Sequence, residues 1–243
     1  MRQFLINLLK RISLNFLLKH TENSLRSYSQ AGQDLWIHTE LYPQRKSGFF
    51  LEIGALDGVH LSNTYMLEKH LDWRGICIEA NPKSFESLKA NRSSKCIHAC
   101  LDDIEHGVEF VLNDVLGGIL APDLDNTPQD HSQGPIIRLK TKTLNQVLKE
   151  ANAPKLIHYM SIDIEGAEER VLRNFDFDSY QINAITVERP SPPLRALLQK
   201  KGYQLVKEIV GLDCFYVHHS LIGHNRGSII KSHSKGIFIH RYD

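Results

Sequence analysis

Apolar, β-branched runs alternate along the chain with segments of helical periodicity from residue 48 onward. The runs at 48–55, 75–80 and 95–101 predict three strands, and the segments at 62–71 and 82–91 predict helices between them. Parallel strands need a long crossover connection, so this order is typical of a parallel sheet wound by helices.

The same alternation continues in the second half of the chain. Its predicted elements are a helix at 143–151, a strand at 156–164, a helix at 166–174, a strand at 182–188, a helix at 191–201 and strands at 203–210 and 213–219. Gly211 and Leu212 separate the last two strands, which we expect to form an antiparallel hairpin. The sequence therefore predicts an α/β fold with a mostly parallel seven-stranded sheet, an antiparallel C-terminal hairpin strand and helices on both faces.

Three segments lie outside this pattern. Within 107–141, GVEFVL and PIIRLKT alternate like the strands of a hairpin around a turn-rich stretch, which indicates an insertion or flap in a domain spanning 25–220. Residues 1–24 predict a basic amphipathic helix, and residues 221–243 predict a basic, His-containing tail. The first of these either docks on protein or lies in an anionic membrane interface through residues 1–20.

Composition narrows the class of protein. Hydrophobic residues make up 42% and charged residues 23% of the 243 positions, which is ordinary globular usage. The 29 Lys and Arg against 28 Asp and Glu leave a formal charge of +1, so no global positive field favours nucleic acid as a partner. The four cysteines form no CxxC pair, and no signal peptide or bilayer-spanning run is evident. We expect a cytoplasmic protein with reduced thiols, with peripheral membrane association left open.

Acidic residues and glycines follow the predicted strands, where α/β sheets bind their ligands. The first loop holds Glu52, Gly54, Asp57 and Gly58, and lacks the GxGxxG pattern of dinucleotide sites. Glu79 ends the second strand near the spacing at which an acidic residue accepts hydrogen bonds from a ribose diol. Together they indicate an adenosine-containing ligand.

These residues resemble the FkbM-type branch of the class I methyltransferases that use S-adenosylmethionine. The resemblance extends through SYSQAGQDL, FLEIGALDGVHLSNT, GICIEANP, MSIDIEGAEERVL and ITVE, in this order. It implies the Rossmann-like class I methyltransferase fold and S-adenosylmethionine as cofactor. Two features depart from the family pattern: Leu56 stands where many class I enzymes have a glycine, and 107–141 follows no pattern that carries over.

The resemblance also implies a set of cofactor-binding residues. Glu52, Gly54, Asp57 and Gly58 should line the methionine and sulfonium side, and Glu79 should hold the ribose hydroxyls. Either Asp102 or its neighbour Asp103 should meet the adenine amino group. The remaining expected contacts come from Gln30, Asn63, Ala80, Asn81 and Ser161. Whether Gln30 and Gln33 approach the cleft, or Ser29 and Asp34 merely begin a capped helix, is left open.

The strongest candidates for catalysis are Asp163, Glu165 and Glu188. If the strand stays extended through residue 165, Ser161, Asp163 and Glu165 share one side, and Glu188 ends the neighbouring strand. Methyl transfer to a hydroxyl needs a group that takes the proton, and a carboxylate serves this purpose. We favour direct carboxylate action. The alternative is a divalent cation such as Mg²⁺ held by Asp163, Glu165 and Glu188.

Other residues have simpler interpretations. Glu168 and Glu169 suit the first turn of a helix, where negative charge is favourable without any catalytic role. His158 lies on the opposite face of the strand from the acidic block, and we expect a core or edge histidine.

The sequence favours an S-adenosylmethionine-dependent O-methyltransferase. The expected acceptor is a hydroxyl of a sugar, glycolipid or secondary metabolite, which makes the partner a small molecule or glycan. One alternative is a binding or interaction module that keeps the fold without catalysis. An NAD-dependent enzyme is disfavoured by the missing GxGxxG pattern, and a nucleic-acid methyltransferase by the charge balance.

Overall fold

The computed structural model describes residues 25–43, 45–128 and 134–224. The predicted N-terminal helix at 1–24 lies outside the described residues. Of the predicted tail at 221–243, only the part up to the end of α8 (His219–His224) is described. None of the helices in the described ranges is long and apolar enough to span a bilayer.

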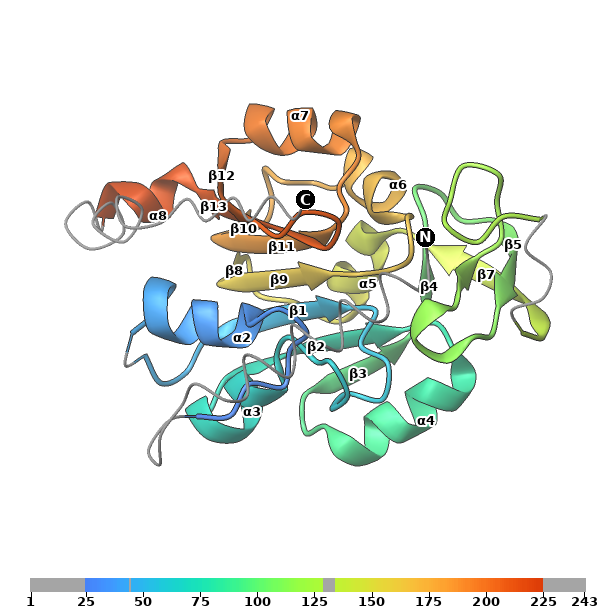
Figure 1. Ribbon diagram of the computed structural model, residues 1–243, viewed down its shortest axis with the longest axis horizontal. Helices are drawn as coiled ribbons and strands as arrows, with labels where there is room; N and C mark the ends of the chain where they lie inside the picture. Colours follow the sequence, from blue (N-terminus) through green and yellow to red (C-terminus); the bar gives the residue numbers. More distant parts are fainter. Residues whose placement is uncertain (1–24, 44, 129–133, 225–243) are drawn as a thin grey trace, which may run out of the picture.

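A seven-stranded sheet forms the centre of the molecule (Figure 1). Its strand order is β12-β13-β11-β9-β1-β2-β3. The strands are β1 (Phe49–Ile53), β2 (Arg74–Glu79), β3 (Lys95–His98), β9 (Tyr159–Ile162), β11 (Ala184–Glu188), β12 (Tyr203–Glu208) and β13 (Asp213–His218). Only β13 runs antiparallel to its neighbours, β11 and β12. The predicted α/β fold class, with its antiparallel C-terminal hairpin strand, is confirmed.

Helices cover both faces of this sheet, and the alternation of side chains along β1 explains why. Leu51 and Ile53 belong to one buried apolar cluster, while Phe50 belongs to another on the opposite face. The first cluster includes residues of α5 (Leu144–Glu150), α6 (Glu168–Arg173) and α7 (Pro192–Lys200). The second includes residues of α2 (Gln33–Trp36), α3 (Tyr65–Leu71) and α4 (Pro82–Asn91).

A row of polar side chains crosses the second face. Register pairs Glu52 with Cys77 on one side and with Ser161 on the other, and Ser161 pairs with Thr186. The Thr186 hydroxyl donates to Ser161 Oγ at 3.3 Å, and the Tyr159 hydroxyl lies 2.7 Å from Thr186 Oγ1. The row therefore satisfies part of its own hydrogen bonding inside the protein.

The predicted insertion at 107–141 forms most of a separate sheet with the order β4-β7-β5-β6. Its strands are β4 (Cys100–Leu101), β5 (Gly107–Val111), β6 (Gly118–Ile119) and β7 (Ile136–Lys142). β5 and β7 pair antiparallel, so the predicted hairpin is confirmed. β4 pairs with β7 as well, and the predicted strand at 95–101 is therefore two strands in two different sheets. Figure 1 shows β5 and β7 beyond the carboxyl ends of the central strands.

The predicted strand at 156–164 is also wrong in its bounds. Leu156–Ile157 forms β8, which pairs with β10 (Gln181–Ile182) in a small sheet, and β9 ends at Ile162. Asp163 therefore follows the strand, although its backbone N–H still donates to the Ile53 carbonyl at 3.0 Å. The four cysteines are all free thiols, as expected.

Candidate active site

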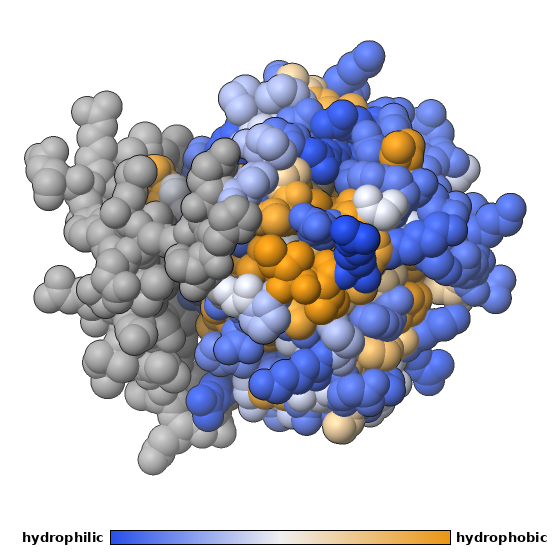
Figure 2. Space-filling view, turned by 90° about the vertical axis from the view of Figure 1, so that its right-hand side faces the viewer, coloured by the Kyte–Doolittle hydropathy of each residue, from blue (hydrophilic) through white to orange (hydrophobic). Residues whose placement is uncertain are grey.

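A cavity of about 680 Å³ lies between the carboxyl ends of the central strands and the insertion, and this volume suits a small-molecule ligand. The insertion contributes apolar side chains to the wall, among them Phe110, Val115, Leu116 and Ile119. Figure 2 views the side of the molecule that carries the insertion and shows hydrophobic residues around a hollow, with polar residues surrounding them. The predicted site residues that line the cavity are Gln30, Glu52, Gly54, Asn63, Glu79, Ala80, Ser161, Asp163, Glu165 and Glu188.

The loop after β1 turns sharply because two of its residues adopt positive φ. Gly54 has φ 82°, and a Cβ there would lie 1.8 Å from the Asp163 carbonyl oxygen, so only glycine fits. Leu56 has φ 50° and keeps the left-handed conformation at the position where the family pattern has glycine. This departure from the family pattern leaves the turn intact.

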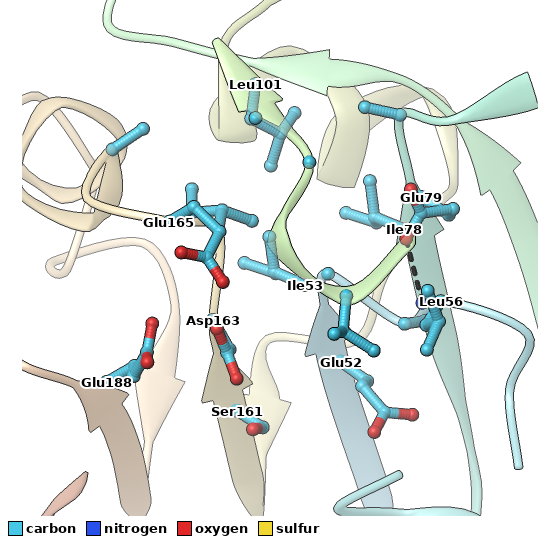
Figure 3. Close-up of a pocket in the computed structure, with 18 of the residues that line it drawn as sticks. Glu52, Ile53, Leu56, Ile78, Glu79, Leu101, Ser161, Asp163, Glu165 and Glu188 are labelled. Carbon is cyan, nitrogen blue, oxygen red and sulfur yellow. Dashed lines mark hydrogen bonds between the residues drawn. The ribbon is translucent and has the colours of Figure 1, made fainter. Parts of the chain in front are cut away.

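Glu79 lies at the end of β2 with its carboxylate in the cavity wall (Figure 3). Its oxygens accept hydrogen bonds from the backbone N–H groups of Leu56, at 2.8 Å, and Asn81, at 2.7 Å. Burial raises the pKa of the Glu79 carboxyl to about 7, against the effect of these donors. The side chain is fixed in place and presents a hydrogen-bond acceptor to the cavity, as a ribose diol requires.

Glu52 has a largely structural set of contacts. Its carboxylate accepts hydrogen bonds from the Ser62 hydroxyl, the Asn63 backbone N–H and the Thr64 hydroxyl. It also forms a buried ion pair with Arg92, with 3.0 Å between Nη1 and Oε2. Glu52 therefore holds the loop before α3 against the cavity, in addition to lining it.

Asn63 presents an unsatisfied acceptor. Its side-chain Nδ2 donates to Ser161 Oγ at 2.7 Å, whereas the buried Oδ1 has no hydrogen-bond partner. A buried polar atom without a partner is costly, and a ligand that donates a hydrogen bond would satisfy it. The ammonium group of S-adenosylmethionine is such a donor. Glu79 lies on the β2 side of the cavity, and the tight turn at Gly54 lies between Glu79 and Asn63. The residues present therefore fit S-adenosylmethionine.

Four of the predicted cofactor-binding residues lie outside the cavity lining. Asp57 caps its own turn by accepting from the N–H groups of Val59 and His60. Gly58 packs against Leu88 and Arg92, where a Cβ would come within 2.7 Å of both side chains. 

The other two are Asn81 and Asp102. Asn81 is the N-cap of α4 and accepts from the Lys83 and Ser84 N–H groups. Asp102 Oδ2 is engaged by His106 Nε2 at 3.0 Å and by Arg170 Nη1 at 3.3 Å. These contacts give Asp57, Gly58, Asn81 and Asp102 structural roles that need no bound ligand.

Asp163 and Glu188 form a carboxyl pair at the other side of the cavity. Their side chains are hydrogen-bonded to each other, which requires a proton on one of them. Burial raises the pKa of Asp163 to about 8, and burial together with the Asp163 charge raises the pKa of Glu188 well above its usual range. At least one of the two carboxyls therefore carries a proton near neutral pH.

Glu165 reaches the same region by a different route from the one predicted. Extended backbone does not continue to it, because β9 ends at Ile162 and Glu165 has φ 55°. Its carboxylate nevertheless lines the cavity near Asp163 (Figure 3). Burial, with Glu188 nearby, raises the pKa of Glu165 to about 8.

One acidic cluster, Asp125, Glu165 and Glu188, has a spacing that would suit a metal ion. Arg189 already contacts all three carboxylates, at 2.5, 3.4 and 2.9 Å respectively. This cluster shares Glu165 and Glu188 with the divalent-cation alternative predicted from the sequence, but it contains Asp125 in place of Asp163.

The remaining residues discussed from the sequence have structural contacts, with the exception of Gln30. His158 Nδ1 accepts from the Phe49 backbone N–H, and burial lowers the pKa of its imidazole to about 4. Gln33 is buried, donates to Asp213 and does not line the cavity, whereas Gln30 lines it. Glu168 accepts from the backbone N–H groups of Ile164 and Gly166, and so supports the loop before α6.

Sequence reasoning missed two arginines and the part that the insertion takes in the site. Arg92 at the end of α4 neutralises Glu52 and Glu68, and Arg189 follows Glu188 directly. Neither lies in a motif, although the position of Arg189 beside a strand-end carboxylate is a signal that sequence alone offers. The insertion contributes Asp125 to the acidic cluster as well as the apolar wall.

The comparisons with known proteins agree with this fold. The model of the methyltransferase FkbM domain matches residues 52–205, which is more than half of the chain. No significant match was found among curated proteins.

Solved structures with similar chains include several methyltransferases. The methyltransferase FkbM from Methylobacillus flagellatus KT has a TM-score of 0.46 at 13% identity, covering 88% of this chain and 58% of that one. A methyltransferase from Pyrococcus furiosus has 0.41 at 16% identity, with 89% and 96% covered. Precorrin-6y C5,15-methyltransferase from Geobacter metallireducens GS-15 has 0.42 at 12% identity, with 81% and 92% covered.

The present chain thus spans less than two thirds of the Methylobacillus flagellatus protein. At these TM-scores the three structures do not add to the assignment, which rests on the domain match and on the sheet topology. The chain has the class I methyltransferase fold and belongs to the FkbM methyltransferase domain family.

Proposed function

We propose that this protein is an S-adenosylmethionine-dependent O-methyltransferase acting on a hydroxyl of a sugar, glycolipid or secondary metabolite. The observation that carries the proposal is one cavity with Glu79 on one side and the Asp163–Glu188 carboxyl pair on the other (Figure 3). β2, β1 and β9 are adjacent, so the ends of β2 and β9 lie about 10 Å apart at the usual spacing of strands. At this distance Glu79 can hold the cofactor at one side of the cavity, and the Asp163–Glu188 pair can accept a proton at the other side.

The residues divide the work as follows. Glu79 accepts hydrogen bonds from the ribose hydroxyls, and Asn63 Oδ1 accepts one from the ammonium group of the methionine part. When bound, S-adenosylmethionine supplies the methyl group. The ionised member of the Asp163–Glu188 pair accepts the proton of the acceptor hydroxyl, and its raised pKa suits a base that works near neutral pH.

The residues of the cavity wall indicate which class of acceptor fits the site. The lining contains no Lys or Arg among the described residues, and the insertion makes its wall apolar. This supports a small-molecule or glycan acceptor and gives no support to a nucleic acid, whose phosphates attract basic residues. The cytoplasmic location and the membrane contact of residues 1–20 remain predictions from the sequence.

Calorimetric titration with S-adenosylhomocysteine tests the cofactor site. We expect clear binding by the wild type and by Glu109→Gln, a surface control on the insertion, and weaker binding by Glu79→Ala. Asp163→Asn should bind with an affinity close to that of the wild type. Absence of binding by folded wild-type protein would refute the methyltransferase proposal.

Transfer of a labelled methyl group to a panel of hydroxyl-bearing sugars, glycolipids and secondary metabolites then tests the chemistry. Asp163→Asn should lower the rate by about 100-fold or more, because a general base contributes that much or more. Cofactor binding without transfer to any acceptor would favour the alternative of a non-catalytic binding module.

A further inference from the structure

Arg189 has an unusual environment at the catalytic side of the cavity. A single atom, Nη2, lies 2.5 Å from Asp125 Oδ2, 2.9 Å from Glu188 Oε2 and 3.4 Å from Glu165 Oε2. These three carboxylates approach within 4.8 Å of one another, the spacing of ligands around a metal ion. The guanidinium nitrogen therefore occupies the position from which a cation would contact all three.

The three carboxylates come from different parts of the chain. Asp125 belongs to the insertion, Glu165 to the loop after β9, and Glu188 to the end of β11. A backbone hydrogen bond from Asp125 N–H to the Glu165 carbonyl, at 3.3 Å, runs beside the ion pairs. Arg189 thus lies where the insertion meets two loops of the central sheet.

The backbone of Arg189 is itself held in place. Its N–H donates to the Leu212 carbonyl at 2.8 Å, and its φ of 38° lies in the left-handed region that non-glycine residues rarely adopt. Such a conformation persists only where the surroundings hold it. The fold therefore holds the backbone from which the Arg189 side chain reaches the carboxylates.

We propose that Arg189 is the resident cation of this carboxylate cluster: it positions Glu188 for catalysis, ties the insertion to the cavity through Asp125, and takes the place of a divalent metal ion. The link to catalysis rests on the proposed function, whereas the contacts are independent of it. Arg189 is a positioning residue, because it acts through Glu188.

The charges around Glu188 explain why a cation is needed. Asp163, Glu165, Glu168, Asp213 and Asp125 face this region from the loop after β9, from α6, from β13 and from the insertion. Arg189 is the only cation that the described contacts of Glu188 include. Removing it would leave several buried acidic groups with no counter-charge, which favours either protonation or capture of another cation.

Binding of Mn²⁺ alone, measured by electron paramagnetic resonance and calorimetry, tests the proposal without methyl transfer. Arg189→Ala frees the three carboxylates and should bind Mn²⁺ at least about tenfold more tightly than the wild type. Arg189→Lys keeps the charge and should bind as weakly as the wild type. Arg138→Ala, which removes an exposed arginine of the insertion, is the matched control and should also bind weakly.

Two further variants locate the bound ion and test whether Arg189 links the insertion to the cavity. Adding Glu165→Gln to Arg189→Ala should abolish the gained Mn²⁺ binding. Asp125→Asn keeps Arg189 and should speed amide exchange in residues 120–126, whereas Glu109→Gln should not. Asp125→Asn alters only the edge of the carboxylate cluster. It therefore still tests the proposal if Arg189→Ala fails to fold.

The proposal is overturned if the wild type binds Mn²⁺ as tightly as Arg189→Ala, if Arg189→Ala binds no more tightly than Arg138→Ala, or if Asp125→Asn leaves exchange unchanged. Titration of each variant with S-adenosylhomocysteine keeps the two proposals apart. Retained binding together with any of these results would refute the role of Arg189 and leave the methyltransferase proposal standing.

Discussion

Glu79→Gln should gain stability relative to the wild type as the pH rises, while weakening cofactor binding. The Glu79 side chain is 8% exposed, and burial raises its pKa to about 7 from 4.5. The folded state therefore holds the proton more tightly than the unfolded state. It follows that the contribution of Glu79 to stability is fully present below about pH 4.5 and is lost as the pH rises through about 7.

The size of this effect follows from the two pKa values. Each pKa unit corresponds to about 1.4 kcal/mol, so moving from 4.5 to about 7 amounts to about 3.5 kcal/mol of stability lost when Glu79 ionises in the folded protein. A neutral glutamine does not incur this loss. It has one acceptor oxygen in place of two, so one of the N–H groups of Leu56 and Asn81 loses its partner at every pH.

Urea unfolding of the wild type and Glu79→Gln at pH 5 and at pH 8.5 measures the difference. Other buried acidic groups, such as Asp163 and Asp213, are present in both proteins and cancel in the comparison. We expect the free energy of unfolding of Glu79→Gln to rise relative to that of the wild type by about 2.5 kcal/mol between the two pH values, because part of the contribution is already lost at pH 5. A difference that does not change with pH would refute the reasoning.

The affinity of Glu79→Gln for S-adenosylhomocysteine gives a second test of the role of Glu79. A hydrogen bond to a charged group contributes about 1.5–3 kcal/mol, so Glu79→Gln should weaken S-adenosylhomocysteine binding by about tenfold to 150-fold. Calorimetry at pH 8.5, where the wild-type carboxylate is ionised, measures this loss. Unaltered affinity would mean that Glu79 does not hold the ligand.

Three further predictions concern the first loop and the metal question. Gly54→Ala should lower the free energy of unfolding by about 3 kcal/mol or more in urea titrations, because its Cβ would meet the Asp163 carbonyl at 1.8 Å; a cost below about 1 kcal/mol would contradict the tight approach. Leu56→Gly should change that free energy by less than about 1 kcal/mol, because relief at φ 50° offsets the greater flexibility of glycine; a large loss would show that the Leu56 side chain matters more. Methyl transfer should persist after exhaustive EDTA treatment, and activity lost to EDTA and restored by Mg²⁺ would show metal dependence.

The sequence predicted the central sheet well because its strands are buried on both faces. In β1, Leu51 and Ile53 face one apolar cluster and Phe50 the other, which makes the run apolar throughout and easy to recognise. The rule that ligands bind at the carboxyl ends of parallel strands then placed Glu79, Asp163 and Glu188 around one cavity.

The remaining differences come from long-range pairing, which local patterns do not contain. The apolar run at 95–101 reads as one strand, yet Cys100 and Leu101 pair with β7, about 40 residues later in the chain. Glu165 departs from extended backbone for a similar reason, because its carbonyl accepts from Asp125 of the insertion. Asp57 and Asn81 lie beside the ligand-binding loops in sequence, but their side chains cap local backbone and do not reach the cavity.

The polar row across β2, β1, β9 and β11 has a consequence for how the strands find their alignment during folding. Glu52 and Ser161 lie on the face that also carries Arg92 and Asn63, where each finds a partner. A shift of one residue in β1 would move Glu52 among the leucines and valines of α5 and α7, with no cation to meet it. Misaligned pairing would bury a lone carboxylate, so the residues that shape the ligand site also select the native alignment of the sheet.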